Sequence, residues 1–239
     1  MRPRKLSLLL AGLAVALGLS GIAHAVNPNI RGRVSGQDKL LPDVYAEAAK
    51  PKANRWTWRE PSPAVEAQFR TLSANLSRDV CIAATSASTA GPQEPVLMKI
   101  TGGRIVPTTL AVSPKTKLVL KNLDPFPHKA YIVGNKGFSA EVIQPNGTRE
   151  WTAPDGNGRY ELRDELYPSV RTWVVVDPQV LQVAYPGRDG AFAFALPAGD
   201  YVLKAYFGGK RVGKSTSVVA KDRGTFELKE PLNLAEGGD

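Results

Sequence analysis

Histidine, cysteine and methionine are scarce in this sequence. Its 239 residues contain two histidines, His24 and His128, one cysteine, Cys81, and two methionines. A lone cysteine cannot form an internal disulfide. Cys81 lies in a short apolar stretch, residues 79–83, where we predict a small buried strand residue; a thiol that pairs between chains is the alternative.

Long hydrophobic runs are also absent after residue 25. A basic start and an apolar run over residues 6–19 precede the small residues Ala23 and Ala25, as in a secretory signal peptide. A transmembrane helix, the alternative, needs about 20 apolar residues. We predict cleavage near Ala25, which removes residues 1–25 and leaves a periplasmic or secreted protein without a transmembrane anchor. No cysteine stands at the cleavage point, so no lipid anchor is expected.

Charge of one sign is nowhere concentrated. The net charge is +9, yet no run of five or more like charges occurs, so a nucleic-acid partner is not expected. The spread of lysine and arginine indicates a solvated basic surface, which tolerates acidic polysaccharides or lipid headgroups.

Short alternating strands separated by turn residues dominate the sequence. They are expected at 30–34 and 43–48 and, after residue 95, at 96–100, 109–112, 117–120, 172–176, 191–194 and 201–206. One helix is predicted near residues 63–76, where Val65, Phe69, Leu72 and Leu76 recur at helical spacing. Strands and helices do not alternate, so we predict a mainly β fold of sandwiches or barrels.

Residues 95–177 carry two motifs with family-specific spacing. The first runs from Gly103 through Asn122 and Asp124 to His128, and the second covers residues 160–176, with Pro168 before a last strand. The segment resembles the bacterial cupredoxins, most closely plastocyanin-like proteins associated with methylamine utilisation. The resemblance implies a Greek-key β-sandwich in which His128 stands at the position of the first copper ligand.

The remaining copper ligands of that family have no counterpart here. Cysteine, histidine and methionine follow at three-residue steps in the family, whereas this chain has Asp164, Tyr167 and Val170. A blue-copper site needs a thiolate and two imidazoles. We therefore predict no metal and no cofactor, with His128, the only candidate ligand, as a hydrogen-bonded or surface histidine. A rearranged site from Cys81, Met98 and His128 is the minor alternative.

Residues 178–239 show a second resemblance. The Asp189–Gly190 turn, the alternating strand after it, the turn from Leu196 to Gly199 and the strand that opens with Tyr201 are similar to a carboxypeptidase regulatory-like, or transthyretin-like, module. This implies a second small β-sandwich. Residues 30–48 also resemble the start of such a module, so a split module completed by residues 185–228 is an option. The predicted division is 1–25, 26–94, 95–177 and 178–239.

Residues 208–215 match the P-loop pattern to the letter. A phosphate-binding loop must open a helix, but the residues after Ser215 are β-branched and strand-like. We predict a basic hairpin turn between strands and no nucleotide partner.

No catalytic constellation is visible in the sequence. His128 has no nucleophile motif nearby, and Asp164 and Glu165, as neighbours on a strand, are interpreted as solvated turn charges rather than paired carboxylates. We expect an exported, non-enzymatic binding or structural protein of the cell envelope, with an envelope protein or polysaccharide as its partner. A periplasmic copper-binding or electron-transfer protein with an atypical site is the alternative. A hydrolase would need a nucleophile that the sequence does not offer.

Overall fold

The computed structural model describes residues 29–41, 74–235 and 237. The predicted signal peptide, the strand at 43–48 and residues 63–73 of the predicted helix lie outside these ranges. Within them the helical elements are the single turn α2 (Leu76–Asp79) and two short 3-10 helices, η1 (Gln37–Lys39) and η3 (Lys136–Phe138). No helix among the described residues is long and apolar enough to cross a membrane.

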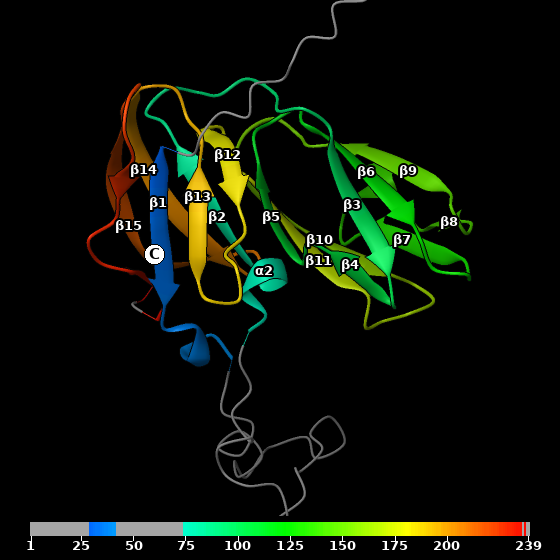
Figure 1. The fold of residues 1–239 in the computed structure, drawn as a ribbon. Helices are drawn as coiled ribbons and strands as arrows, with labels where there is room; N and C mark the ends of the chain where they lie inside the picture. Colours follow the sequence, from blue (N-terminus) through cyan, green and yellow to red (C-terminus); the bar gives the residue numbers. More distant parts are fainter. Residues whose placement is uncertain (1–28, 42–73, 236, 238–239) are drawn as a thin grey trace, which may run out of the picture.

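Four sheets build two β-sandwiches that lie side by side (Figure 1), which confirms the mainly β fold. The first sandwich contains β3 (Val96–Thr101), β4 (Arg104–Val106), β5 (Thr109–Val112), β6 (Lys117–Asn122), β7 (His128–Ile132), β8 (Glu141–Ile143), β9 (Thr148–Thr152), β10 (Gly158–Asp164) and β11 (Arg171–Val176). The second contains β1 (Ile30–Ser35), β2 (Val80–Thr85), β12 (Val180–Ala184), β13 (Ala191–Phe194), β14 (Gly199–Phe207), β15 (Lys210–Ala220), β16 (Phe226–Glu227) and β17 (Leu232–Asn233).

The first sandwich has the cupredoxin-like layout. One sheet has the order β5-β11-β10-β7-β8 and the other β4-β3-β6-β9. Two pairs of strands, β5 with β11 and β3 with β6, run parallel although they are far apart in sequence, so long connections cross between the sheets. Alternate residues of each strand point inward and fill one core, in which Met98, Leu118 and Leu120 of one sheet meet Leu162 and Val174 of the other.

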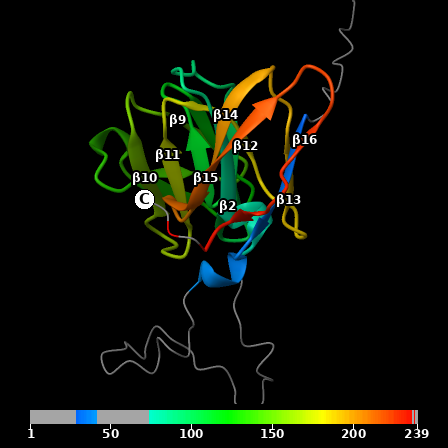
Figure 2. The same ribbon diagram turned by 90° about the vertical axis from the view of Figure 1, so that its left-hand side faces the viewer.

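The second sandwich draws strands from both ends of the described chain (Figure 2). β1 lies between β13 on one side and β16 and β17 on the other, and β2 lies between β12 and β14. Residues before position 95 therefore form sheets with residues after position 178. This pairing is the one that a split module requires; membership of the carboxypeptidase regulatory-like family stays a prediction.

The two sandwiches share a buried interface. Cys81 and Ala83 of β2 and Tyr206 of β14 pack against Ala111 of β5 and Val180 of β12. Cys81 is fully buried in a strand, as predicted, and burial raises the pKa of its thiol to about 12. At neutral pH the thiol is therefore protonated and has no nucleophilic character.

Polar contacts hold the same interface at its edges. Lys204 on β14 donates from Nζ to Asp177 Oδ2 at 2.9 Å, and the backbone N–H of Gly208 donates to Thr109 Oγ1 at 3.0 Å. The guanidinium of Arg159 lies 4.0 Å from the centre of the Trp173 ring and donates to the Gly208 carbonyl. These contacts fix the β14–β15 hairpin against the first sandwich.

The P-loop pattern forms a hairpin, as predicted. β14 and β15 are antiparallel and are joined by Gly208 and Gly209, whose φ values of 56° and 73° suit a tight two-residue turn. The turn is shorter than expected, because residues 210–215 already belong to β15. No helix N-terminus follows the turn, so the backbone amides that would hold a phosphate are absent from it.

Replacement of the lysine in this pattern tests the hairpin interpretation. Lys214 is exposed on β15, so Lys214→Ala should change the free energy of unfolding by no more than about 0.5 kcal/mol. In calorimetric titrations with Mg-ATP, the wild type and the variant should both give only the heat of dilution. Nucleotide binding by the wild type that disappears in the variant would contradict the hairpin interpretation.

Candidate functional site

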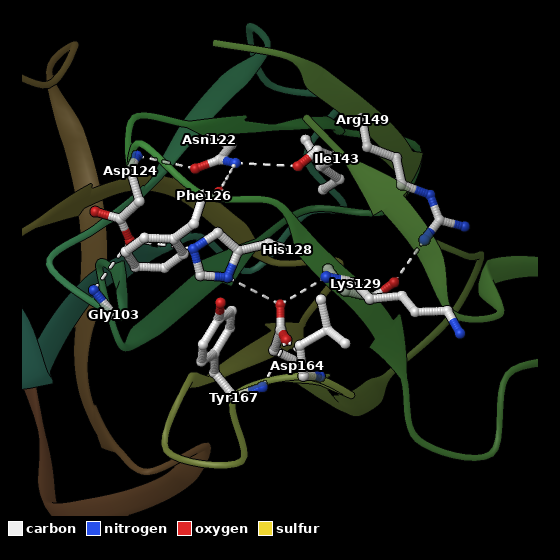
Figure 3. A network of polar contacts seen from close by, with 12 residues as sticks. Gly103, Asn122, Asp124, Phe126, His128, Lys129, Ile143, Arg149, Asp164 and Tyr167 are labelled. Carbon is white, nitrogen blue, oxygen red and sulfur yellow. Dashed lines mark hydrogen bonds and ion pairs between the residues drawn. The ribbon is translucent and has the colours of Figure 1, made fainter. Parts of the chain in front are cut away.

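His128 is the first residue of β7, and its side chain is completely buried in the first sandwich. Both of its ring nitrogens face carboxylates (Figure 3). Nδ1 lies 3.0 Å from Asp164 Oδ2, and Nε2 lies 3.1 Å from Asp124 Oδ2. Asp124 and Asp164 are themselves only 6% and 3% exposed. We refer to Asp124, His128 and Asp164 as the buried triad.

Asp164 ends β10 and is held by the backbone on both of its oxygens. Oδ1 accepts hydrogen bonds from the N–H groups of Leu166 and Tyr167 at 2.8 and 2.9 Å, and Oδ2 accepts one from Lys129 at 2.9 Å. With His128 Nδ1, four donors surround this carboxylate. These donors take the place of water around the buried side chain.

Asp124 is held by a glycine pair in the β3–β4 turn. Its Oδ1 accepts from Gly102 N–H at 2.6 Å and its Oδ2 from Gly103 N–H at 3.0 Å. Both glycines have positive φ, 57° and 67°, so consecutive N–H groups point to one side and form a small anion-binding concavity. Burial opposes ionisation of Asp124, but the N–H groups of Gly103 and Gly102, together with His128, hold the pKa of Asp124 below its usual range.

Asn122 sets the position of Asp124. Its Oδ1 accepts from the Asp124 N–H at 2.9 Å, while its Nδ2 donates to the carbonyls of Phe126 and Ile143 at 2.8 and 3.0 Å. Asn122 is fully buried, so these bonds satisfy its amide without water. The turn between β6 and β7 is thereby fixed from the inside.

Hydrogen-bond donors surround both carboxylates. Every other group that contacts them is a backbone N–H. The two ring nitrogens of His128 complete a network in which every polar atom has a partner. Buried polar groups are tolerated when they are paired and hydrogen-bonded in this way.

Two aromatic rings pack against the His128 ring. The centres of the Phe126 and Tyr167 rings lie 5.2 and 5.1 Å from the centre of the His128 ring and 5.0 Å from each other. Figure 3 shows both rings next to the His128 ring. They keep water from the hydrogen bonds to Asp124 and Asp164, which strengthens the electrostatic attraction within the triad.

The three residues at the expected copper-ligand positions lie in different surroundings. Asp164 faces Nδ1 of His128, Tyr167 packs against its ring, and Val170 is fully buried in the core of the first sandwich. The expectation that Asp164 is a solvated turn charge is wrong, because four hydrogen bonds replace its hydration. Glu165 is half-exposed and pairs with Lys129 at 2.6 Å, as expected of a surface charge. The expectation that His128 is hydrogen-bonded is confirmed.

Asp124 is a site residue that the sequence analysis did not single out. It appeared only as part of the turn before His128. The available signal was an acidic residue four positions before the one histidine of the described chain. The hydrogen bond from Gly103 to Asp124 spans 21 residues, and the spacing of the motif that contains both residues does not predict it.

The residues present do not fit a copper centre. The two carboxylates lie on opposite sides of the imidazole ring, and both nitrogens are already engaged. Within the described ranges, no three His, Cys, Asp or Glu side chains converge so that they could hold one metal ion. Cys81 lies in the interface between the sandwiches and Met98 in the first core, which argues against the rearranged copper site.

Comparison with solved structures gives partial similarity to copper proteins. An amicyanin variant in its reduced state is 20% identical, with a TM-score of 0.32, and the match covers 40% of this chain and 99% of that protein. Another amicyanin variant, in its Cu(I) form, is 19% identical with the same TM-score and the same coverage. The copper-containing nitrite reductase of Thermus scotoductus is 18% identical, with a TM-score of 0.31, over 38% of this chain and 24% of that protein.

No protein-family model matches the sequence. No curated protein matches it at a significant level either.

Introducing copper ligands at residues 164, 167 and 170 tests whether these residues stand at the ligand positions of the cupredoxins. Nδ1 of His128 faces residue 164, and the ring of residue 167 lies 5.1 Å away, so Asp164→Cys with Tyr167→His and Val170→Met should gain copper affinity and a blue absorption band. Copper titration followed by visible spectroscopy is the measurement. Tyr167→His with Val170→Met, which keeps the carboxylate, is the control and should gain much less.

Because Val170 is fully buried, methionine could overfill the core, and Asp164→Cys with Tyr167→His serves as a second test. A folded triple or double variant that binds copper no better than the parent would mean that residue 164 is not the position of the thiolate.

The carboxylate of Asp124 should stabilise the fold in a pH-dependent way. Its pKa is lower in the folded chain, so its contribution is full above the unfolded pKa, about 4, and is lost as the pH falls through the lower folded value. At pH 7, Asp124→Asn should reduce the free energy of unfolding by roughly 2 kcal/mol, the scale of a lost charged hydrogen bond. The difference should shrink towards pH 2.

Urea unfolding of both proteins across this pH range is the measurement. Asp155→Asn is a matched control, since the Asp155 side chain is 77% exposed and forms a loose ion pair with Lys115, at 3.5 Å. It should have little effect at any pH. A loss for Asp124→Asn that stays constant as the pH falls would contradict the ionised state of the carboxylate.

Proposed function

We propose that this protein is an exported, non-enzymatic binding or structural protein of the cell envelope, built on a cupredoxin-like scaffold that does not use copper. One observation carries the proposal. His128, at the position of the first copper ligand of cupredoxins, is completely buried, and both of its ring nitrogens contact carboxylates, those of Asp124 and Asp164.

The triad argues against copper binding on chemical grounds. A metal must take a lone pair from an imidazole nitrogen, so it would have to displace the carboxylate that contacts Nδ1 or Nε2 of His128. It would also need a thiolate near by, whereas the Cys81 thiol is protonated and buried elsewhere. The first sandwich therefore keeps the architecture of an electron carrier without a group that could carry an electron.

The same contacts argue against acid–base catalysis. A general base needs a free nitrogen within reach of the proton that it removes. In the described chain, both His128 nitrogens contact carboxylates, and the ring is completely buried. No described serine or cysteine donates to it. With the predicted signal peptide, these features favour a secreted scaffold whose surfaces bind an envelope protein or polysaccharide.

Copper titration of the purified, processed protein tests the proposal. We expect no stoichiometric Cu(I) or Cu(II) and no blue absorption band. The Asp164→Cys, Tyr167→His, Val170→Met variant is a matched positive control for the assay. About one copper per chain in the wild type, lost in His128→Gln, would favour the alternative of a copper-binding or electron-transfer protein with an atypical site.

A further inference from the structure

The outer face of the β13-β1-β16 sheet carries an open basic groove. We infer that it binds an acidic polysaccharide. The inference rests on the proposed function, which places the protein outside the cytoplasm, and it names the partner class and the surface that binds it. The groove has a volume of about 580 Å³, and β1, β13 and the segment after β15 line it.

The alternation of β1 determines which side chains enter the groove. Ile30 and Val34 are buried in the core of the second sandwich, and Arg31 and Arg33 between them are exposed on the other face. Gly32 allows this arrangement, because a Cβ there would lie 2.7 Å from the Phe192 ring on the core side. The close approach of Phe192 keeps β1 in this orientation.

Small side chains flank the two arginines on one side. In the antiparallel register Arg31 lies opposite Ala193 and Arg33 opposite Ala191, so on the β13 side the floor of the groove lies close to the backbone. On the other side Glu227 of β16 lies beside Arg31 in the parallel register. Residues two apart on a strand are about 6.6 Å apart along it. The two guanidinium groups therefore form a short row above a shallow floor, to which an extended ligand has access along its length.

The charges of the groove are only partly compensated. Its cations are Arg31, Arg33 and Lys229, and its one acid is Glu227. Arg33 has a loose contact of 3.7 Å with the exposed Asp189. Among residues 29–41, 74–235 and 237, no side chain forms an ion pair with Arg31 or Lys229. The groove thus offers two unpaired cations to an anionic ligand.

Polymeric carboxylates fit these features better than the other anionic partners. Guanidinium groups bind carboxylates with two parallel hydrogen bonds, and a row of them suits a ligand that repeats its carboxylate. A membrane surface or a protein interface would need large apolar anchors. The large exposed apolar side chains of the described chain are elsewhere, at Leu97, Leu123, Val133, Val142, Leu166, Leu181 and Val219.

Calorimetric titration of the processed protein with polygalacturonate oligomers tests the inference. We expect binding at low ionic strength that weakens strongly in about 0.5 M salt, because salt screens exposed charges. Arg31→Thr with Arg33→Thr should weaken binding about tenfold or more, the effect of losing charged hydrogen bonds. Threonine is chosen because it suits a strand.

A charge-matched control separates the groove from net charge. Lys99→Thr with Arg104→Thr removes two exposed cations from β3 and β4 of the first sandwich and should leave binding almost unchanged. If the arginine variant fails to fold, Ala193→Glu is the second test. It places a carboxylate opposite Arg31 without a change in β1, and it should also abolish binding.

Several results would overturn the inference. They are no binding of polygalacturonate by the wild type, equal loss in the arginine variant and its control, equal binding of neutral dextran, and tighter binding of vesicles that contain an anionic lipid. None of these results depends on copper, so a failed polygalacturonate titration would leave the proposed function intact. Copper binding by the wild type would overturn the proposed function, but it would not decide whether the groove binds polygalacturonate.

Discussion

The buried contacts of His128 with Asp124 and Asp164 are the interaction on which the first sandwich depends at this end. They join the Gly102–Gly103 turn, through Asp124, to the end of β10, through Asp164. In a metal centre an ion draws such loops together; here the hydrogen bonds of the two ring nitrogens have that role. The arrangement holds because every oxygen of both carboxylates has a donor, and a buried charge without one would be strongly destabilising.

The second constraint is the interface between the two sandwiches, which are built from interleaved segments of the chain. β5 of the first sandwich packs on β2 and β12 of the second, around Cys81, Ala111 and Val180. Close packing at Gly209 adds to it, since a Cβ there would lie 2.7 Å from Arg159 Nε and 2.9 Å from Trp173 Cβ. The loops that carry the triad therefore belong to a sandwich that is stabilised by its own core and also by its interface with the second sandwich.

Local sequence patterns predicted the strands well. They could not predict contacts between residues that are far apart in the sequence. Alternation predicted β1, β3, β6 and β11, because alternate burial is a property of each strand alone. The burial of Asp164 was missed, because its donors include Lys129 N–H, 35 residues away, and a polar residue beside a turn is usually solvated. The pairing of β1 with β13 was raised only through a family resemblance, since Ile30 and Phe194 are 164 residues apart.

The contrast between the two sandwiches supports the proposed place of binding. In the first, the polar groups around His128 satisfy one another, and a group whose hydrogen bonds are complete gains little from a ligand. In the second, Arg31 and Lys229 face solvent without an ion-pair partner among the described residues, so a polyanion would compete there only with water and salt ions. The outer face of β1, far along the chain from His128, is therefore the surface on which we propose recognition.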